Sequence, residues 1–293
     1  MEQIGALTQR GLAAVTRLAR RLGLPADEPV VLSHRGNLLV HLTPAPVVAR
    51  VATLTGTWRL DPMAWLAREV AVAGFVAERG GPVVPPAAEA GPYWQDGLAI
   101  SLWQLVVPRD VQPGPADVGA ALGRLHLAAR DCPTDLGELH PATDQITDGL
   151  AMLERNAVID AETLATLRAR HVAALADLRA AGGEPIVLHG DAHHGNLVGV
   201  GEWLWIDLEE TGRGPAAWDL ATMVRYSHAE DGLAALRAYA AETHTDVPTA
   251  ADLAPFRRVR DIEAAVWALG VAQSYPARYR DTAQKLLATV LEG

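Results

Sequence analysis

The sequence has few of the features that mark a secreted, disulfide-bonded or membrane-spanning chain. Its 293 residues include a single cysteine, Cys132, so no disulfide can form within the chain. Residues 1–24 carry four arginines in an amphipathic pattern instead of the uninterrupted apolar core of a signal peptide, and no later apolar run is long enough to span a bilayer. From these absences we expect a protein of the reducing cytoplasm.

Lysine is almost absent, and the charge is unevenly distributed. Lys285 is the only lysine, and every other basic residue is an arginine. The formal net charge is −10, whereas residues 1–100, with nine arginines and eight acidic residues, are nearly neutral. This acidic excess argues against nucleic acid and membrane as partners, and it suits a cationic small molecule bound by the second half. Solubility alone would explain the excess equally well.

Hydrophobic periodicity and turn residues predict an α+β fold with two lobes. A leading helix (4–23), β-rich pieces (30–32, 38–42, 47–51), a helix from Asp61 to about Glu78 and short strands between 83 and 107 form the first lobe, residues 1–106. The second lobe, residues 107–293, contains a strand–loop–strand unit at 186–206. Its remaining segments have helical spacing, and they are 116–130, 143–156, 161–181, 216–228, 230–243, 251–272 and 276–291.

The strongest chemical signal lies between His189 and Asp207. Phosphoryl transfer needs a carboxylate that orients the acceptor hydroxyl and takes its proton, and oxygen ligands that hold Mg²⁺ against the phosphates. Asp191 follows an apolar strand on a loop with two glycines, Asn196 lies five residues on, and Asp207 closes a later apolar strand. If the two strand ends lie side by side, these oxygen donors meet at one place and suit Mg²⁺.

These residues resemble the aminoglycoside phosphotransferases and their choline-kinase-like relatives. The catalytic loop of that family reads His-Gly-Asp-x-His-x-x-Asn, and the segment from His189 to Asn196 matches it. In the family an Asp after an apolar strand is followed, twelve residues later, by Asp-Leu-Ala at the start of a helix. Asp207 and Asp219 fit that spacing. Ala192 and His194 replace the usual Leu and Pro of the loop, which bears on the acceptor more than on the reaction.

The resemblance implies a protein-kinase-like fold and a kinase of small molecules. The reaction would move the γ-phosphate of ATP or GTP to a hydroxyl, with Mg²⁺ as cofactor. Asp191 would be the catalytic base, and Asn196 and Asp207 would hold the magnesium. The residues that would brace the loop are His189, His193 and Asp219.

The first lobe matches the family less closely. A kinase-like lobe needs a cation on its third strand, paired with a helical Glu, to hold the nucleotide phosphates. Lys285 lies too near the C-terminus for this role, so the cation must be an arginine. Arg50 is the best placed and Glu69 is its expected partner, since an arginine fork also binds phosphate. A surface arginine on an edge strand is the alternative for Arg50.

Other residues of the first lobe are assigned to the nucleotide by their position. Asn37 lies at the end of the turn from Ser33, where the phosphate-covering turn should be, although an ordinary hairpin turn fits as well. Trp103 and Leu105 lie where the family binds adenine through backbone groups. We expect His126 to be a packed structural residue and not a catalytic one. Trp203 and Trp205 alternate on one strand, so we expect one of them to be in the core.

The acceptor is the least determined part. Carboxylates that could pair with its ammonium groups are Glu209, Glu210, Asp261 and Glu263, with Glu230 and Asp231 as further candidates. Asp261 and Glu263 lie about 200° apart on a helix, so we expect at most one of them to face the acceptor.

Four functions are compatible with these residues. The first is a kinase of a cationic acceptor such as an aminoglycoside or another basic antibiotic, with a role in antibiotic resistance. A metabolic kinase for an amino alcohol or a sugar is the nearest alternative. Another alternative is a zinc metallohydrolase built on His189, Asp191, His193 and His194. The last is a protein that binds a nucleotide without catalysis.

Overall fold

The computed structural model describes residues 2–34, 36–53, 56, 61–137, 141–225 and 227–292. Arg35, in the expected phosphate-covering turn, lies outside them. The chain divides into two compact units. The first consists of Met1–Gln112, Asp131–Thr134 and Val198–Glu209, and the second of Pro113–Arg130, Asp135–Leu197 and Glu210–Gly293. The division at Gln112 falls in the proline- and glycine-rich cluster that separates the β-rich part of the sequence from the helical part.

The elements follow in this order along the chain. Up to Gln112 they are α1 (Glu2–Leu22), β1 (Val30–His34), β2 (Leu38–His41), β3 (Val47–Val51), α3 (Pro62–Glu78), β4 (Tyr93–Gln95) and β5 (Leu98–Gln104). Then come α4 (Pro115–Ala128), a π-helical turn η1 (Pro141–Gln145), α5 (Ile146–Arg155), α6 (Ala161–Ala181), β6 (Ile186–Leu188), η2 (His194–Asn196), β7 (Leu197–Gly199) and β8 (Trp203–Trp205). The last are η3 (Leu208–Glu210), β9 (Gly212–Gly214), α7 (Ala217–Arg225), α8 (Ala229–Thr243), α9 (Ala250–Ser274) and α10 (Pro276–Glu292).

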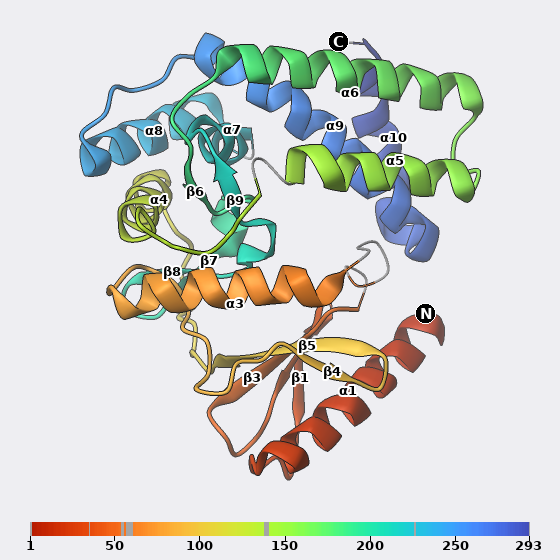
Figure 1. Ribbon diagram of the computed structural model, residues 1–293, viewed down its shortest axis with the longest axis vertical. Coiled ribbons are helices and arrows are strands. Elements are labelled where there is room, and N and C mark those ends of the chain that lie inside the picture. The colour runs from red at the N-terminus through yellow and green to blue at the C-terminus, as the bar shows by residue number, and fades with distance from the viewer. Residues whose placement is uncertain are drawn as a thin grey trace. The chain divides into compact units, whose positions relative to one another are not determined.

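The first unit is built on an antiparallel sheet with the order β1-β2-β3-β5-β4 (Figure 1). The apolar stripe of α1 packs on one face, where Leu18 shares a core with Leu38 and Ile100. On the other face, Leu66 of α3 packs against Ala99. The start of α3 is fixed as the sequence predicts, because Asp61 accepts a hydrogen bond from the N–H of Ala64 at 3.0 Å and a proline occupies the first turn.

Side chains alternate between the two faces of the sheet along β3, and this alternation decides on which face Arg50 lies. Ala49 and Val51 are buried in the core on the α1 side, so Arg50, between them, points to the face that α3 covers. There it meets Glu69, a buried residue of α3. A strand with period 2 and a helix on the opposite face therefore place this pair.

The second unit is a helical assembly around α9, which packs against α5, α6, α7 and α10 (Figure 1). A capping box between Thr249 and Asp252 begins this helix. Its buried residues run along its length, among them Phe256, Val259 and Val266. Two charged residues, Arg260 and Glu263, belong to the same buried part of the helix.

Most of the expected elements are present, with two differences. No extended strand forms over 83–90 of the described chain, where single bridges replace it, such as Pro86 with Trp103. The strand β9, which the sequence did not predict, pairs with β6. Its Gly-Arg-Gly sequence has no β-propensity, so tertiary pairing creates it. The strand before Asp191, β6, is therefore not a neighbour of β8, the strand before Asp207: β6 pairs with β9, and β8 pairs with β7.

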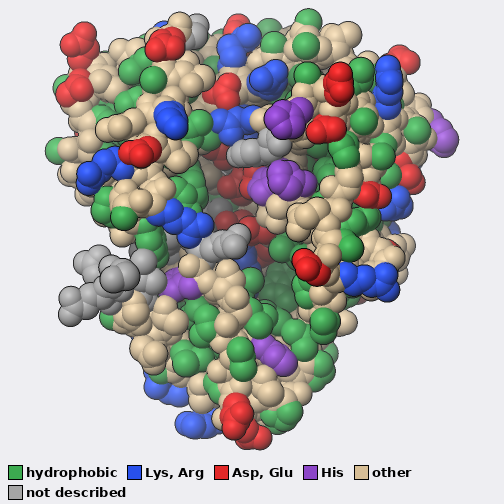
Figure 2. Space-filling model, turned by 180° about the vertical axis from the view of Figure 1, so that it is seen from behind, with side chains coloured by type: hydrophobic (Ala, Val, Ile, Leu, Met, Phe, Trp, Pro, Cys, Tyr) green, Lys and Arg blue, Asp and Glu red, His purple; other side chains and the backbone are tan. Residues whose placement is uncertain are grey.

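On the face shown in Figure 2, Lys and Arg side chains are interspersed with Asp and Glu side chains. Across the residues that the structure describes, no helix combines the length and the apolar character needed to cross a membrane. Trp205 is fully buried, which confirms that one of the two alternating tryptophans of β8 is core.

Candidate active site

The loop after β6 takes a shape that requires glycine at one position. Gly190 has φ +93°, in the half of backbone space that residues with a Cβ atom rarely adopt. A Cβ atom there would lie 2.0 Å from the backbone oxygen of Glu210. This close approach brings the backbone of Glu210 next to the residue that precedes Asp191.

Asp219, near the start of α7, is fully buried and ties this loop in place. Its Oδ2 accepts from the N–H of His189 at 2.7 Å, and its Oδ1 accepts from the N–H of Gly190 at 2.9 Å. Nε2 of His126 lies 2.9 Å from Oδ2, and the other ring nitrogen of His126 lies 2.9 Å from the hydroxyl of Tyr239. Asp219 thus makes the contacts of a brace, and His126 is the packed histidine that the sequence favours.

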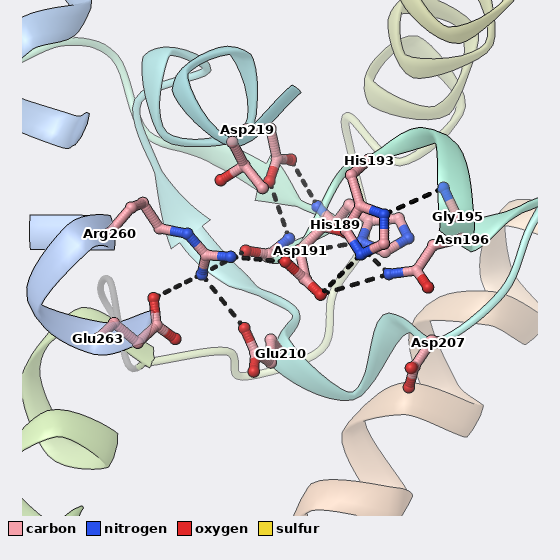
Figure 3. A network of polar contacts seen from close by, with 12 residues as sticks. His189, Asp191, His193, Gly195, Asn196, Asp207, Glu210, Asp219, Arg260 and Glu263 are labelled. Atoms are coloured by element: carbon pink, nitrogen blue, oxygen red, sulfur yellow. Dashed lines mark hydrogen bonds and ion pairs between the residues drawn. The ribbon is translucent and has the colours of Figure 1, made fainter. Parts of the chain in front are cut away.

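The backbone and side chain of Asp191 are both held (Figure 3). Its N–H donates to Nδ1 of His189 at 3.2 Å. Oδ1 accepts from a terminal nitrogen of Arg260 at 2.5 Å. Oδ2 has two longer contacts, each of 3.4 Å, with Nε2 of His193 and with Nδ2 of Asn196. The two oxygens are therefore different: Oδ1 is fixed by a charged donor, and Oδ2 is loosely held.

Electrostatics keep Asp191 ionised. Burial would raise the pKa of this carboxyl, but the hydrogen bond from His193 and the positive charge of Arg260 together hold that pKa below its usual value. Asp191 is consequently a weak base with a fixed position. That suits phosphoryl transfer, in which orientation of the attacking hydroxyl contributes more than base strength.

Asn196 ends the turn η2 and turns one side of its amide toward Asp191. Its Nδ2 donates to the backbone oxygen of Asp191 at 3.0 Å. His193 caps the same turn, since its Nδ1 accepts from the N–H of Gly195 at 3.0 Å. The carbonyl oxygen of Asn196, the atom able to bind a cation, takes no part in these bonds.

Arg260 is the residue at this site that the sequence did not predict. Its guanidinium, with a side chain 7% exposed, donates to Glu263 at 2.6 Å and to Glu210 at 3.3 Å, in addition to Asp191. It also donates to the backbone oxygen of Gly190 at 3.3 Å and lies 5.2 Å from the ring centre of Trp218. Arg260 is thus connected both to the loop backbone and to the carboxylate that the loop carries.

Gln145, at the end of η1, connects the same two glutamates from another side. Its Nε2 lies 3.2 Å from Oε1 of Glu210 and 3.3 Å from Oε1 of Glu263, whereas Arg260 binds the Oε2 atoms. Burial raises the pKa of Glu263 to about 7, with a further contribution from the charge of Asp191 and against the opposing charge of Arg260. The guanidinium of Arg260 is shared by the side chains of Asp191, Glu210 and Glu263.

A signal for Arg260 does exist in the sequence. Phe256, Arg260, Glu263 and Val266 follow one another at steps of three or four, the spacing of one helix face. An Arg–Glu pair within an apolar helix face is a marker of a buried ion pair. Nothing in the spacing says which distant loop the pair touches, because 69 residues separate Arg260 from Asp191.

In the first unit, Arg50 binds three carboxylates. A terminal nitrogen lies 2.5 Å from Glu69, and the other lies 2.5 Å from Asp207 and also contacts Glu209. Burial would lower the pKa of Arg50, but these carboxylates, Glu209 foremost, raise it. The expected Arg50–Glu69 pair is present, and the alternative of a surface arginine is wrong, since the Arg50 side chain is 7% exposed. Its contact with the nucleotide stays a prediction.

Three carboxylates surround the guanidinium of Arg50. They are those of Glu69, Asp207 and Glu209, and all contact this one guanidinium. Asp207 has φ +65°, an uncommon conformation for a residue with a side chain, and such conformations cluster at functional sites. Carboxylate oxygens are hard donors of the kind that Mg²⁺ prefers.

The other nucleotide candidates lie in the first unit as well. Nδ2 of Asn37 donates to Glu209 at 3.2 Å. Nε1 of Trp103 donates to the hydroxyl of Ser101 at 2.9 Å. The N–H of Leu105 donates to the oxygen of Pro46 at 2.9 Å, so this backbone donor is already used.

The four carboxylates assigned to the acceptor all pair with arginines. Glu209 binds Arg50, and Glu210 and Glu263 bind Arg260. Asp261 binds Arg225 at 2.8 Å. Asp261 and Glu263 therefore have different partners, as their separation around the helix predicts.

A zinc hydrolase has no support from this geometry. The His189 ring accepts a hydrogen bond from the loop backbone, and His193 caps the turn that follows. Within the described part of the chain, no group of three or more His, Cys, Asp and Glu side chains has the arrangement of a metal site.

Comparison with known proteins identifies the family. The model of a phosphotransferase enzyme family matches residues 37–256, a span that includes every residue of the two motifs. A search among curated proteins gave no match.

Solved structures show the same fold. A choline/ethanolamine kinase family protein from Mesorhizobium loti has a TM-score of 0.66 at 20% identity, with 97% of this chain and 94% of that chain covered. The aminoglycoside phosphotransferase APH(3'')-Id from Streptomyces rimosus has a TM-score of 0.57 at 20% identity, with 86% and 98% covered. The GDP and kanamycin complex of APH(2")-IIIa has a TM-score of 0.65 at 13% identity, with 96% and 98% covered.

These similarities confirm the protein-kinase-like, two-lobed α+β fold that the resemblance implies. They leave the hydrolase alternative without support. The chain belongs to the phosphotransferase enzyme family and is a phosphotransferase that acts on hydroxyl groups.

Proposed function

We propose that this enzyme transfers the γ-phosphate of ATP or GTP to a hydroxyl of a small molecule, with Asp191 as the base. One observation carries the proposal: Asp191 is fixed at Oδ1, while Oδ2 has only long contacts among the described residues. The pKa of this carboxyl, held below its usual value by His193 and Arg260, agrees with that role. In the reaction, the acceptor oxygen bonds to the γ-phosphorus as the bond from phosphorus to the bridging oxygen breaks. The acceptor proton moves to Asp191, and the nucleoside diphosphate leaves with the electron pair.

We propose that Asn196 and Asp207 supply oxygen ligands to Mg²⁺ when nucleotide is bound. The place of Asp207 among the carboxylates around Arg50 supports this for Asp207. For Asn196 the support is its side-chain carbonyl oxygen, which takes no part in the bonds that Nδ2 makes to Asp191. Mg²⁺ bound to the phosphates would neutralise the charge that develops on the leaving group. Arg50 and Asn37 are proposed to act on the nucleotide side, with Glu69 fixing Arg50.

The charge of the acceptor is a separate question. The acidic second half of the chain favours a cationic acceptor, and similar structures include a choline/ethanolamine kinase family protein and a kanamycin complex. Glu210 and Glu263, however, already pair with Arg260. We propose that an acceptor ammonium group, if present, pairs with other carboxylates, for which exposed Glu230 and Asp231 on α8 are candidates.

The test is a screen that keeps donor and acceptor apart. ATP and GTP are each supplied with Mg²⁺, and release of the diphosphate is measured with aminoglycosides, amino alcohols and sugars against a reaction without acceptor. We expect diphosphate release that depends on one acceptor class, with one phosphorylated product formed for each diphosphate released. If calorimetry detects no Mg²⁺-dependent binding of either nucleotide, the proposed function is wrong. Phosphorylation of an aminoglycoside would favour a role in antibiotic resistance. Phosphorylation of an amino alcohol or a sugar would favour a role in metabolism.

A further inference from the structure

The side chain of Arg260 occupies the centre of a carboxylate cluster in the second unit (Figure 3). Its two terminal nitrogens take different tasks. One binds Oδ1 of Asp191 at 2.5 Å. The other binds Glu263 at 2.6 Å and, at 3.3 Å, both Glu210 and the oxygen of Gly190. The guanidinium therefore connects the carboxylate of Asp191 to two glutamates and to the loop backbone.

The planar fork of an arginine fixes orientation as well as charge. Its N–H groups have set directions, so a carboxylate that binds one of them cannot turn freely, whereas a lysine ammonium is a point charge on a flexible stem. The guanidinium of Arg260 is itself held by Glu263 and lies near the ring of Trp218, whose Nε1 donates to the same Gly190 oxygen at 2.9 Å. Arg260 is consequently a rigid anchor for Asp191.

We propose that Arg260 is the positioning residue of the base. By holding Oδ1 of Asp191, it leaves Oδ2 as the oxygen that receives the proton of the acceptor hydroxyl. This inference rests on the proposed function of Asp191 as the base. The contact between Arg260 and Asp191 orients the base, and the glutamates act only by holding Arg260.

The same geometry has a consequence for specificity. Oε2 of Glu210 and Oε2 of Glu263 face a cation that the chain itself supplies, and the Oε1 atoms face Gln145. Arg260 thus occupies the place that an acceptor ammonium group would take between these glutamates. Removal of its side chain should create a site for a small cation next to Asp191.

The variants Arg260→Lys, Arg260→Gln and Arg260→Ala test the role, with Arg258→Gln as the matched control. Arg258 lies two residues away on α9, with a side chain 52% exposed, and its partner is Asp177. Since misplacement by about 1 Å can cost about 10²-fold in rate, we expect Arg260→Gln to lower kcat about 10²-fold with the nucleotide KM unchanged. Arg260→Lys should recover part of the loss, and Arg258→Gln should behave as wild type.

Chemical rescue separates positioning from general stability. Guanidinium chloride, at concentrations far below those that unfold the protein, should restore part of the kcat of Arg260→Ala and none of the activity of Asp191→Asn. Hydrogen exchange gives a readout that does not need activity: amides of the loop from Gly190 to Asn196 should exchange faster in Arg260→Gln than in Arg258→Gln. If Arg260→Gln is too unstable to purify, Arg260→Lys carries the same comparisons.

The outcomes are distinct. Wild-type kcat in both Arg260→Lys and Arg260→Gln, with unchanged loop exchange, would overturn the inference while leaving the function of Asp191 intact. A wild-type enzyme without Mg²⁺-dependent nucleotide binding would overturn the proposed function instead. A lower melting temperature of Arg260→Gln with normal kcat for the folded enzyme would show a structural role only and would also overturn the inference.

Discussion

Substitution of Asp219 by asparagine tests how the loop that carries Asp191 is held. The two carboxylate oxygens of Asp219 accept from the N–H groups of His189 and Gly190, and Oδ2 also meets Nε2 of His126. Asparagine has nearly the same shape but replaces one oxygen by an NH₂ group. In either orientation of the amide, at least one buried N–H then faces another donor.

The magnitude follows from this hydrogen-bond count. A buried donor left without an acceptor costs about 1–3 kcal/mol, and the bonds that remain lose the assistance of a negative charge. We therefore expect the free energy of unfolding to fall by about 2–4 kcal/mol. At about 2–4 °C for each kcal/mol in chains of roughly this size, the melting temperature should fall by about 4–16 °C.

Differential scanning calorimetry is the suitable assay, because it can resolve separate transitions of the two units. The matched control is Asp177→Asn, which removes an exposed carboxylate whose partner is Arg258, and exposed ion pairs contribute about 0–1 kcal/mol. The kcat of folded Asp219→Asn should also fall, since the loop backbone loses a fixed contact. An Asp219→Asn protein that melts within a degree of wild type, with normal kcat, would refute the bracing role.

Two further predictions concern the same unit. Gly190→Ala places a Cβ atom 2.0 Å from the backbone oxygen of Glu210, at a residue with φ +93°. Because backbone strain of about 1–3 kcal/mol adds to this clash, the urea midpoint of unfolding should drop. An unchanged midpoint would contradict the close approach. Burial raises the pKa of Glu263 to about 7 from 4.5, so the folded protein holds this proton more tightly than the unfolded chain, and stability falls as pH rises from 4.5 to 7, by up to about 3 kcal/mol. Glu263→Gln should remove that contribution, so the stability difference between wild type and variant, from urea unfolding at pH 5 and pH 8, should change with pH; a constant difference would show that the pKa is not raised.

The sequence predicts the elements with strong local patterns and the residues of strong motifs. The pair of Arg50 and Glu69 could be found because a period-2 strand fixes the face of Arg50, and a helix of predictable bounds supplies Glu69. The bracing contacts of Asp219 could be expected because its position after Asp207 matches a family motif. In each case the relevant partner lies on an element that the sequence defines by itself.

Features that depend on tertiary packing could not be predicted in this way. The strand β9 has a Gly-Arg-Gly sequence and exists through its pairing with β6. Arg260 belongs to a long helix, and its contact with Asp191 depends on how α9 packs in the second unit. The sequence predicts an acceptor ammonium group as the partner of Glu210 and Glu263, because nothing in it shows that Arg260 lies next to both of them.

The most direct test of the proposed mechanism is the single-turnover rate of Asp191→Asn with the acceptor found in the screen. Asparagine keeps the shape of the side chain and can still contact Arg260 through its oxygen, but it cannot take the acceptor proton. We predict that phosphoryl transfer slows by about 10²- to 10⁴-fold, as expected for loss of a general base, while the Kd of the nucleotide is unchanged. Transfer at the wild-type rate by Asp191→Asn would contradict the assignment of Asp191 as the base.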